Sequence, residues 1–232
     1  MMKLDPTVLR ALAPFAEATE EAISRTMSTG SVRLIAKETA IFDQGAAATQ
    51  FFALIDGYVR VVSSNAQGEQ IIMRYICAGS LFGLAPALDR DTYPASAIAA
   101  KDCVLISWPR SCFDEFCNII PGFAKKNAQT IACRLQDTQA RVMELSIAHV
   151  EKRVAATLLR LTETAGKPVA EGIEINFQIS RQDIAELTGT TLHTVSRLLS
   201  AWSSKGYVST GRKKIIVCNM NALEAMGVNA EI

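Results

Sequence analysis

The chain has 232 residues, 49% of them hydrophobic, which is enough to bury a substantial core in one or two domains. Its formal net charge of +1 excludes a general attraction to nucleic acid or membranes, so any basic binding face has to be local. The sequence contains no run of about 18 apolar residues and no apolar block at its N-terminus. We therefore expect a cytoplasmic protein without a membrane partner.

The cysteines and histidines give little sign of catalytic or metal chemistry. The six cysteines form no C-x-x-C pair, and no closely spaced histidine pair accompanies them, which argues against a structural zinc site. We expect reduced thiols that mostly serve packing, with only a weak redox signal from Cys112 and Cys117 on either side of Phe113. No Ser/His/Asp grouping or glycine-rich phosphate loop is present, so we expect no enzyme and no metal site.

The first half of the chain predicts helix followed by a β domain. Residues 5–29 are rich in Ala and Glu and predict helix. Short apolar segments follow, separated by glycines and by a turn at SNAQGE. Regularly spaced short strands with glycine turns predict a sandwich or a small barrel. The expected strand segments are residues 32–36, 50–63, 69–76, 95–100 and 102–108.

The segment from Pro121 to residue 147 changes character, and Pro121 can begin a helix. Residues at spacings of 4, 3, 4 and 3 then form a seam, with polar residues on the other faces. Such a seam predicts a two-helix dimer contact, but it spans only about two heptads, short of the usual three or four. A helix packed on its own domain is therefore an equal alternative. The seam consists of Ile131, Leu135, Thr138, Val142 and Leu145.

The C-terminal part predicts a helix-turn-helix. An amphipathic helix from residue 150 closes at Gly166, and a strand-like segment follows at residues 174–179. Ser180 and Asp183 form a capping box at the start of a short helix.

That short helix stops at Thr188-Gly189, and Thr190 or Thr191 caps a second helix. Two helices joined by a tight glycine turn are the helix-turn-helix pattern. The stretch GYVSTGRKKIIVCN then predicts two strands around Ser-Thr-Gly-Arg, which make a wing.

The second helix has an apolar face and a polar face, each recurring at helical spacing. The residues expected to face the core are Leu192, Val195, Leu199 and Trp202. The residues expected to face outward are His193, Ser196, Arg197 and Ser200.

In a helix-turn-helix protein the exposed N-terminal half of the second helix enters the major groove. Arg197 can donate two hydrogen bonds to guanine O6 and N7, while Ser196 and His193 can contact a base or a phosphate. The alternatives are a solvated His193 without a role and an Arg197 that forms a salt bridge with Glu186 or Asp183. The residues expected to contact phosphates are Ser180, Arg181, Gln182, Thr191, Thr194 and, on the wing, Arg212, Lys213 and Lys214.

The whole pattern resembles the Crp/Fnr family of bacterial transcription regulators, over roughly residues 20–222. The resemblance rests on IDGYVRVV, AGSLFG, the R-V-A-x-x-L-L-x-L helix and SRQDIAELTGTTLHTVSRLL. It implies an α+β fold and a homodimer, with RNA polymerase as a partner and a two-fold symmetric site on double-stranded DNA. By the same resemblance, residues 1–120 form a β-roll sensor domain that resembles cyclic-nucleotide-binding domains. Residues 121–148 form the dimerisation helix, and residues 149–232 form the winged helix-turn-helix domain.

The family's base-reading pattern is Glu-x-x-Ser/Gly-Arg, which aligns with His193, Ser196 and Arg197. A Glu accepts a hydrogen bond from a cytosine amino group, whereas a neutral His accepts or donates and a charged one only donates. We therefore expect the guanine contact to survive and the preference at the neighbouring base pair to change. TGTTLHTVSR is most similar to the branch of nitric-oxide-responsive NnrR regulators.

The sensor departs from cyclic-AMP-binding relatives, which carry F-G-E followed by R-S. Here Leu84 stands at the Glu position and Pro94-Ala95 at the Arg-Ser position, while Arg90 is a cation at the wrong spacing. An apolar cassette cannot offset the desolvation of a cyclic phosphate, so we expect no cyclic nucleotide as a cofactor. The expected sensor pocket region comprises Phe82, Gly83, Leu84, Pro94 and Ala95.

Fnr-type oxygen sensors bind an iron–sulfur cluster through N-terminal cysteines, and no cysteine precedes Cys77, so we expect no such cluster. Haem would suit a sensor of nitric oxide or carbon monoxide. Its ligand would have to be Cys77, Met73, Tyr75 or a terminal amine, because the sensor segment has no histidine. His149, at the junction before the last domain, could cap the following helix, sense pH, or be a partly exposed linker residue.

We therefore expect a sequence-specific DNA-binding transcription regulator that responds to a gas or redox signal. The alternative is a ligand-binding regulatory module that acts on a protein partner through its winged domain. The exposed Arg197, Ser196 and wing lysines argue against that alternative.

Overall fold

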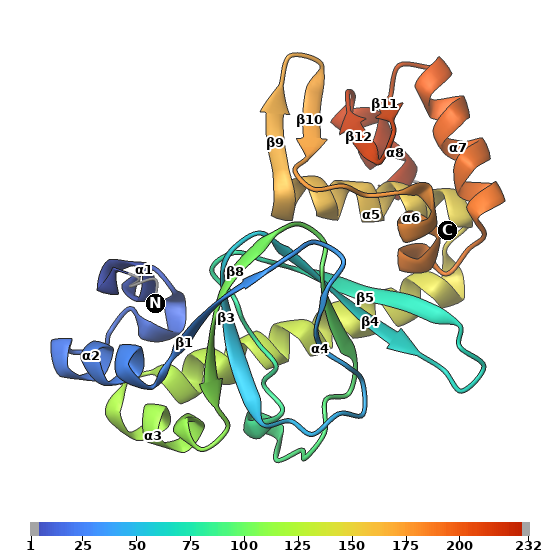
Figure 1. The fold of residues 1–232 in the computed structure, drawn as a ribbon. Helices are drawn as coiled ribbons and strands as arrows, with labels where there is room; N and C mark the ends of the chain where they lie inside the picture. The colour runs from blue at the N-terminus through green and yellow to red at the C-terminus, as the bar shows by residue number, and fades with distance from the viewer. Residues whose placement is uncertain (1–4, 229–232) are drawn as a thin grey trace. The chain divides into compact units, whose positions relative to one another are not determined.

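The structure is a computed structural model that describes residues 5–228 (Figure 1). The chain divides into two compact units. The first contains the residues up to 69 and residues 73–136, and the second contains residues 70–72 and those from 137 onward. None of the helices within residues 5–228 has both the length and the apolarity that a membrane span needs.

The first unit holds two four-stranded sheets, in the strand orders β1-β8-β3-β6 and β2-β7-β4-β5. The register between β3 and β8 is antiparallel and runs from Gln50 opposite Pro109 to Asp56 opposite Val104. This architecture confirms the predicted β domain. The strands are β1 (Ser31–Ile35), β2 (Ala40–Phe42), β3 (Gln50–Asp56), β4 (Tyr58–Ser64), β5 (Gln70–Cys77), β6 (Leu81–Phe82), β7 (Ser96–Ala99) and β8 (Cys103–Pro109).

The predicted strand segment 50–63 splits into β3 and β4 at Gly57. Gly57 has φ +98°, and a Cβ there would lie 2.6 Å from the carbonyl oxygen of Asp102. Only glycine combines this backbone conformation with so close an approach. The short strands β2 and β6 were not predicted, because two or three residues are too few to show an alternation of apolar and polar side chains.

The N-terminal segment differs from the single predicted helix. It forms α1 (Pro6–Arg10), a 3₁₀ turn over Ala13–Phe15, and α2 (Glu20–Thr29). Pro14 lacks the N–H that a continuous helix would need. Thr19 then starts α2 by accepting a hydrogen bond from the backbone N–H of Ala22 at 3.2 Å.

Aromatic rings explain why the chain turns back here. Phe15, which is fully buried, packs with Trp108, Phe116 and Phe123 at centroid distances of 5.4–6.3 Å. The indole N–H of Trp108 donates to the carbonyl oxygen of Thr26 at 2.9 Å, which ties β8 to α2. Burial of these rings against the sheet outweighs the preference of the N-terminal segment for one helix.

The long helix α4 (Phe123–Ile147) begins two residues later than predicted, so Pro121 does not start it. The shorter helix α3 (Cys112–Ile119) precedes it. Gly122 between them has φ +76°, a left-handed conformation that does not belong to a helix. Phe123 is fully buried, and its place in the aromatic cluster sets where α4 starts.

The predicted seam of α4 is mostly uncovered within the chain. Leu135 is 58% exposed, Val142 56% and Leu145 49%, and Thr138 is exposed as well. Ile131 differs, because it packs against the core of the first unit. Packing on its own domain therefore accounts for the first seam residue and leaves the other four uncovered.

The second unit contains a four-stranded antiparallel sheet of order β11-β12-β10-β9 together with helices α5, α6, α7 and α8. The amphipathic helix α5 ends before Gly166 as predicted. The strand-like segment 174–179 is only partly strand, since β10 ends at Ile175 while Phe177 and Ile179 are buried outside the strand. Strand β9 and helix α8 were not predicted. The elements are α5 (Val150–Ala165), β9 (Gly166–Val169), β10 (Gly172–Ile175), α6 (Arg181–Thr188), α7 (Leu192–Ser204), β11 (Val208–Gly211), β12 (Lys214–Val217) and α8 (Met220–Val228).

Candidate nucleic-acid interface

The first helix of the predicted pair, α6, is closed at both ends by its own sequence. The Ser180 hydroxyl accepts from the Asp183 backbone N–H at 3.1 Å, and the Asp183 carboxylate accepts from the Ser180 backbone N–H at 2.6 Å. This confirms the capping box. At the other end Gly189 has φ +59°, and its backbone N–H donates to the carbonyl of Ala185. A left-handed glycine thus makes the turn that leads into α7.

The second helix, α7, is capped by Thr191 and not by Thr190. The Thr191 hydroxyl accepts from the backbone N–H of Thr194 at 3.2 Å, and the two threonine hydroxyls lie 2.9 Å apart. This contact between the two hydroxyls is exposed to solvent.

The two faces of α7 largely match the prediction. Val195 and Leu199 are fully buried and Trp202 is 1% exposed, while the indole N–H of Trp202 donates to Glu151 at 3.1 Å. Leu192 is the exception, because it is 47% exposed. It is the first residue of the helix, and side chains there lean toward the N-terminus, beyond the edge of the core.

The outward face carries the predicted base-contacting residues. His193 and Arg197 are exposed and Ser196 is half-buried, all in the first two turns of α7. The alternative, a salt bridge from Arg197 to Glu186 or Asp183, does not form, and Glu186 instead accepts a hydrogen bond from Gln182 at 3.0 Å. Among residues 5–228 no ion pair involves Arg197. Its guanidinium is therefore available to an external acceptor.

The wing turns two residues later than predicted. Gly211 pairs with Lys214, which leaves Arg212 and Lys213 as the two-residue turn, with Lys213 at φ +57°. Both turn residues are exposed. Lys214 is engaged, because its ammonium lies 2.9 Å from the Glu174 carboxylate. Neither Arg212 nor Lys213 has a carboxylate partner within residues 5–228, so the wing presents two unpaired cations at its tip.

A hollow of about 280 Å³ lies between the starts of α6 and α7 and the wing. Arg181 reaches across it, with its guanidinium 3.5 Å from the hydroxyl of Thr210. Most of the residues predicted to contact phosphates line this hollow, so they lie on one side of the second unit. Those that line it are Ser180, Arg181, Gln182, Lys213 and Lys214.

The junction between α4 and the winged module is held by arginines within the second unit. Arg160 pairs with both carboxylate oxygens of Glu144, at 2.5 and 3.2 Å. Arg141 donates to the carbonyl of Leu187 at 2.5 Å, and Arg153 donates to that of Thr188 at 3.1 Å. His149 is the N-cap residue of α5, as the capping hypothesis has it, but only its backbone carbonyl takes part, because its side chain makes no capping hydrogen bond.

The predicted sensor residues do not gather around one open pocket. Phe82 and Leu84 are buried in two different core clusters of the first unit, while Pro94 is exposed and Ala95 is half-buried. Gly83 has φ +68°, and a Cβ on it would lie 2.9 Å from the Phe52 ring. The segment around Gly83 is therefore tightly packed against the core of the first unit.

A half-buried arginine in the first unit escaped the sequence analysis. Arg134 of α4 donates to the carbonyl of Leu81 at 2.7 Å, directly before Phe82 and Gly83. Burial, and then the positive charge of Arg74, lower the pKa of Arg134 to about 10. In the sequence it looks like an ordinary polar position of an amphipathic helix, so nothing there signals its burial.

The thiols are mostly protected. Cys103 and Cys112 are buried, Cys77, Cys117 and Cys218 are half-buried, and Cys133 is exposed. Burial raises the pKa of Cys77, Cys103 and Cys117, which disfavours the reactive thiolate. Residues 5–228 contain no group of three or more His, Cys, Asp or Glu side chains that could hold a metal ion.

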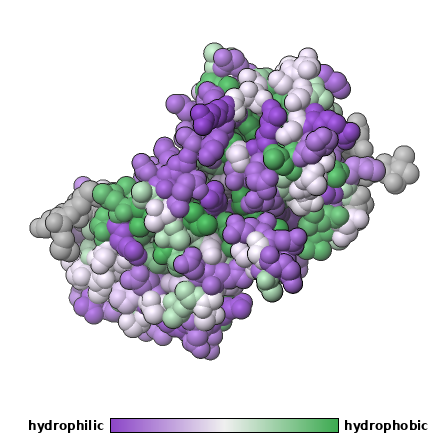
Figure 2. Space-filling view, turned by 45° about the vertical axis from the view of Figure 1, so that its right-hand side comes forward, coloured by the Kyte–Doolittle hydropathy of each residue, from purple (hydrophilic) through white to green (hydrophobic). Residues whose placement is uncertain are grey.

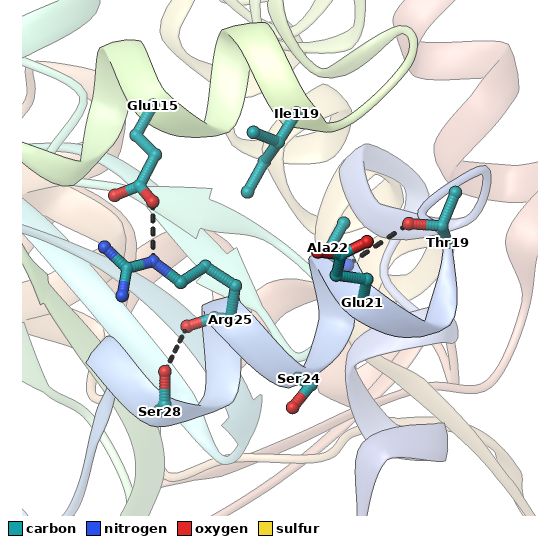
Figure 3. Close-up of a pocket in the computed structure, with 8 residues that line it drawn as sticks. All are labelled: Thr19, Glu21, Ala22, Ser24, Arg25, Ser28, Glu115 and Ile119. Carbon is teal, nitrogen blue, oxygen red and sulfur yellow. Dashed lines mark hydrogen bonds and ion pairs between the residues drawn. The ribbon is translucent and has the colours of Figure 1, made fainter.

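Outside the second unit, a groove of about 670 Å³ lies between α2 and α3 (Figure 3). Its one cation, Arg25, donates to Glu115 at 2.6 Å across the groove. That pairing neutralises the charge which an anionic ligand would need. The face of the molecule in Figure 2 mixes hydrophilic and hydrophobic side chains, so hydropathy alone does not mark a binding surface.

A capped helix-turn-helix with an exposed Arg and a basic wing defines a winged-helix DNA-binding protein. Two family profiles match this chain: a Crp-like helix-turn-helix domain at residues 152–226 and a cyclic nucleotide-binding domain at residues 32–119. The chain is a DNA-binding transcription regulator of the Crp/Fnr family, which is not enzymatic.

Individual relatives support this membership over most of the chain. The Cyclic AMP receptor protein of Thermus thermophilus is 29% identical over 204 residues, which cover 88% of this chain and 91% of the relative. The Global nitrogen regulator of a Nostoc species is 28% identical over 201 residues, 84% of this chain and 90% of the relative. The structure of FixK2 from Bradyrhizobium japonicum has the same fold, with a TM-score of 0.76 at 24% identity over 87% of this chain and 99% of FixK2.

Proposed function

We propose that this regulator acts as a homodimer in the cytoplasm, with RNA polymerase as a further partner. Each α7 would enter the major groove of one half of a two-fold symmetric DNA site. In this proposal residues 1–120 sense the signal, residues 121–148 dimerise and residues 149–232 bind DNA. The observation that carries it is the division of α7 into a buried apolar face and an exposed face with Arg197.

The contacts on that face divide into base and phosphate contacts. Arg197 pairs with guanine O6 and N7, and His193 and Ser196 contact neighbouring base edges. Arg212 and Lys213 are the strongest candidates for phosphate contacts because neither has a carboxylate partner among the described residues. The Ser180 hydroxyl and the Lys214 ammonium contribute less, since Asp183 and Glu174 already engage them. The remaining phosphate contacts are Arg181, Gln182, Thr191 and Thr194.

Affinity measurements on a duplex enriched from random DNA by the purified protein test this proposal. Arg197→Ala should weaken binding by about 1–3 kcal/mol per half-site and relax the preference at one base pair. Ser200→Ala is the matched control, since Ser200 is exposed on the same helix two turns into it. Unchanged base discrimination in Arg197→Ala would refute the contact. Weak binding that does not fall with rising salt would favour the alternative, a module that acts on a protein partner.

The second part of the proposal concerns the signal, which we propose is a gas or redox cue and not cyclic AMP. Leu84, at the position where cyclic-AMP binders hold the ribose, is 5% exposed and packs in the core. Pro94, at the position where cyclic-AMP binders carry the Arg, offers neither a charge nor an N–H to a phosphate. Calorimetry with cyclic AMP should therefore detect no binding. A saturable heat would overturn this part and leave the DNA-binding part intact.

Within this proposal the chain belongs to the nitric-oxide-responsive NnrR-type branch, and haem is the cofactor that would suit it. Met73, Tyr75 and Cys77 alternate along β5, so they lie on one face of the strand, where all three are half-buried. The fit is partial, because burial holds the Cys77 thiol protonated whereas haem ligation needs its thiolate. Haem would supply the atom that binds nitric oxide. A haem titration of the oxygen-free protein, followed by nitric oxide and a gel shift, tests this, and absence of saturable binding would remove haem.

A further inference from the structure

The carbonyl groups at the end of α6 are bound by arginines from two other helices. The last carbonyls of a helix have no partner inside it, and nearby cations stabilise them. Arg141 of α4 donates to the carbonyl of Leu187 at 2.5 Å. Arg153 of α5 donates to the carbonyl of Thr188 at 3.1 Å. Both carbonyls come directly before Gly189, so the two arginines hold the turn from which α7 starts.

Arg141 also holds the start of strand β5. The same nitrogen, Nη2, donates to the carbonyl of Ile72 at 3.3 Å, and Ile72 is 1% exposed. This nitrogen carries two hydrogens, one for each carbonyl. Residues 70–72 of β5 belong to the second unit, and the strand continues from Met73 within the first. One side chain therefore binds both the turn before α7 and the first residues of a strand that belongs mostly to the first unit.

A further contact brings α4 against the same turn. A Cβ on Gly189 would lie 3.1 Å from Cδ2 of Leu145, which follows Arg141 by four residues on α4. A turn packed this closely leaves little space to absorb a movement. A displacement of the Arg141 guanidinium therefore has to move the end of α6 or break its hydrogen bond to Leu187.

We propose that Arg141 is a positioning residue for DNA recognition, which couples strand β5 to the orientation of α7. The inference rests on the proposed function, in which α7 enters the major groove and the candidate haem ligands lie on β5. A shift of β5 moves the Ile72 carbonyl, and the shared donor nitrogen passes that shift to the Leu187 carbonyl. Coupling between two sites is reciprocal, so DNA that favours the arrangement with both hydrogen bonds stabilises the start of β5 by the same factor.

Amide hydrogen exchange with and without DNA tests this coupling. The probe is the duplex enriched by the wild-type protein, and the readout is the exchange of residues 70–77, the whole of β5. DNA should slow this exchange about tenfold in the wild type, the lower end for one hydrogen bond from a charged donor. Arg141→Met keeps a long side chain without a donor, so it should lose the protection and bind the duplex about tenfold more weakly. Its salt dependence should match wild type, because a positioning residue contacts no phosphate.

Arg153→Met is the matched control. Arg153 binds the same turn through Thr188, but it donates to no atom of β5 within residues 5–228. This variant should weaken DNA binding while DNA still protects β5. Arg141→Lys keeps a charged donor and should recover part of the protection. If Arg141→Met does not fold, Arg141→Gln takes its place in the same measurement, with the same expected loss.

Three results would overturn the inference. DNA could leave β5 unprotected in the wild type, the protection could persist in the Arg141 variant, or Arg153→Met could lose it to the same extent. In each case an Arg197→Ala variant that loses base preference leaves the proposed function standing. Failure of the wild-type protein to enrich any duplex overturns both.

Discussion

The exposed seam of α4 allows a quantitative test of dimerisation. Leu135 is 58% exposed and Val142 is 56% exposed in the single chain. Full burial of a Leu or Val side chain stabilises by about 1.5–3 kcal/mol, so covering the exposed half is worth roughly 1–1.5 kcal/mol per residue. The double variant Leu135→Ala/Val142→Ala removes four such contributions from a symmetric dimer, about 4–6 kcal/mol in total. Its dimer dissociation constant should rise by about 10³–10⁴.

Sedimentation over a concentration series measures this change directly. Met143→Ala is the matched control, because Met143 is 59% exposed on the same helix but lies off the seam. The control should dissociate like wild type. If the double variant and the control had equal dimer affinities, the seam would not be the dimer contact, and the reasoning from exposure and spacing would be refuted.

Three further predictions concern single residues. His193→Glu should restore a hydrogen-bond acceptor beside Arg197 and shift the preferred neighbouring base pair toward one that presents a cytosine amino group, as read from the enriched sequences. Asp183→Ala removes one half of the capping box and should lower the free energy of unfolding by about 1 kcal/mol in denaturant titrations. Cys133 should be the only thiol that reacts fast with an aromatic disulfide, because it is the exposed one and burial raises the pKa of Cys77 and Cys103.

For each of these three predictions, one experimental result would contradict it. Identical enriched sequences for His193→Glu and wild type would mean that residue 193 does not contact a base. Asp183→Asn keeps an acceptor and should recover most of the lost stability, so equal destabilisation by Ala and Asn would argue against the cap. A fast phase that persists in Cys133→Ser would show that one of the packed thiols is accessible.

Sequence reasoning succeeded where the signal is local. The capping box at Ser180 and the end of α6 at Thr188-Gly189 each involve groups within four or five residues, and both form as predicted. The buried stripe of α7 is also local, since Val195, Leu199 and Trp202 follow directly from helical periodicity. These local features are enough to place His193 and Arg197 on the outward face of α7.

Sequence reasoning failed where distant residues compete with local preference. The N-terminal helix breaks because Phe15 is drawn into a ring cluster that includes Trp108, far along the chain. Leu192 fits the apolar period but lies past the edge of the core, which periodicity does not describe. Arg134 looks solvent-facing on α4, yet it is half-buried and donates to the carbonyl of Leu81 in β6.

The sequence by itself determined the class of this protein. A capped helix-turn-helix with a polar outer face depends on residues only three or four positions apart, and their spacing can be read directly from the sequence. The tertiary structure alone decided which apolar residues stay uncovered and which cations stay unpaired, since both depend on what the rest of the chain brings nearby. Lys214 illustrates this: its role on the wing changes once Glu174, on a neighbouring part of the sheet, lies 2.9 Å away. Burial and charge pairing are sums over contacts distant in sequence, so only the folded chain reveals them.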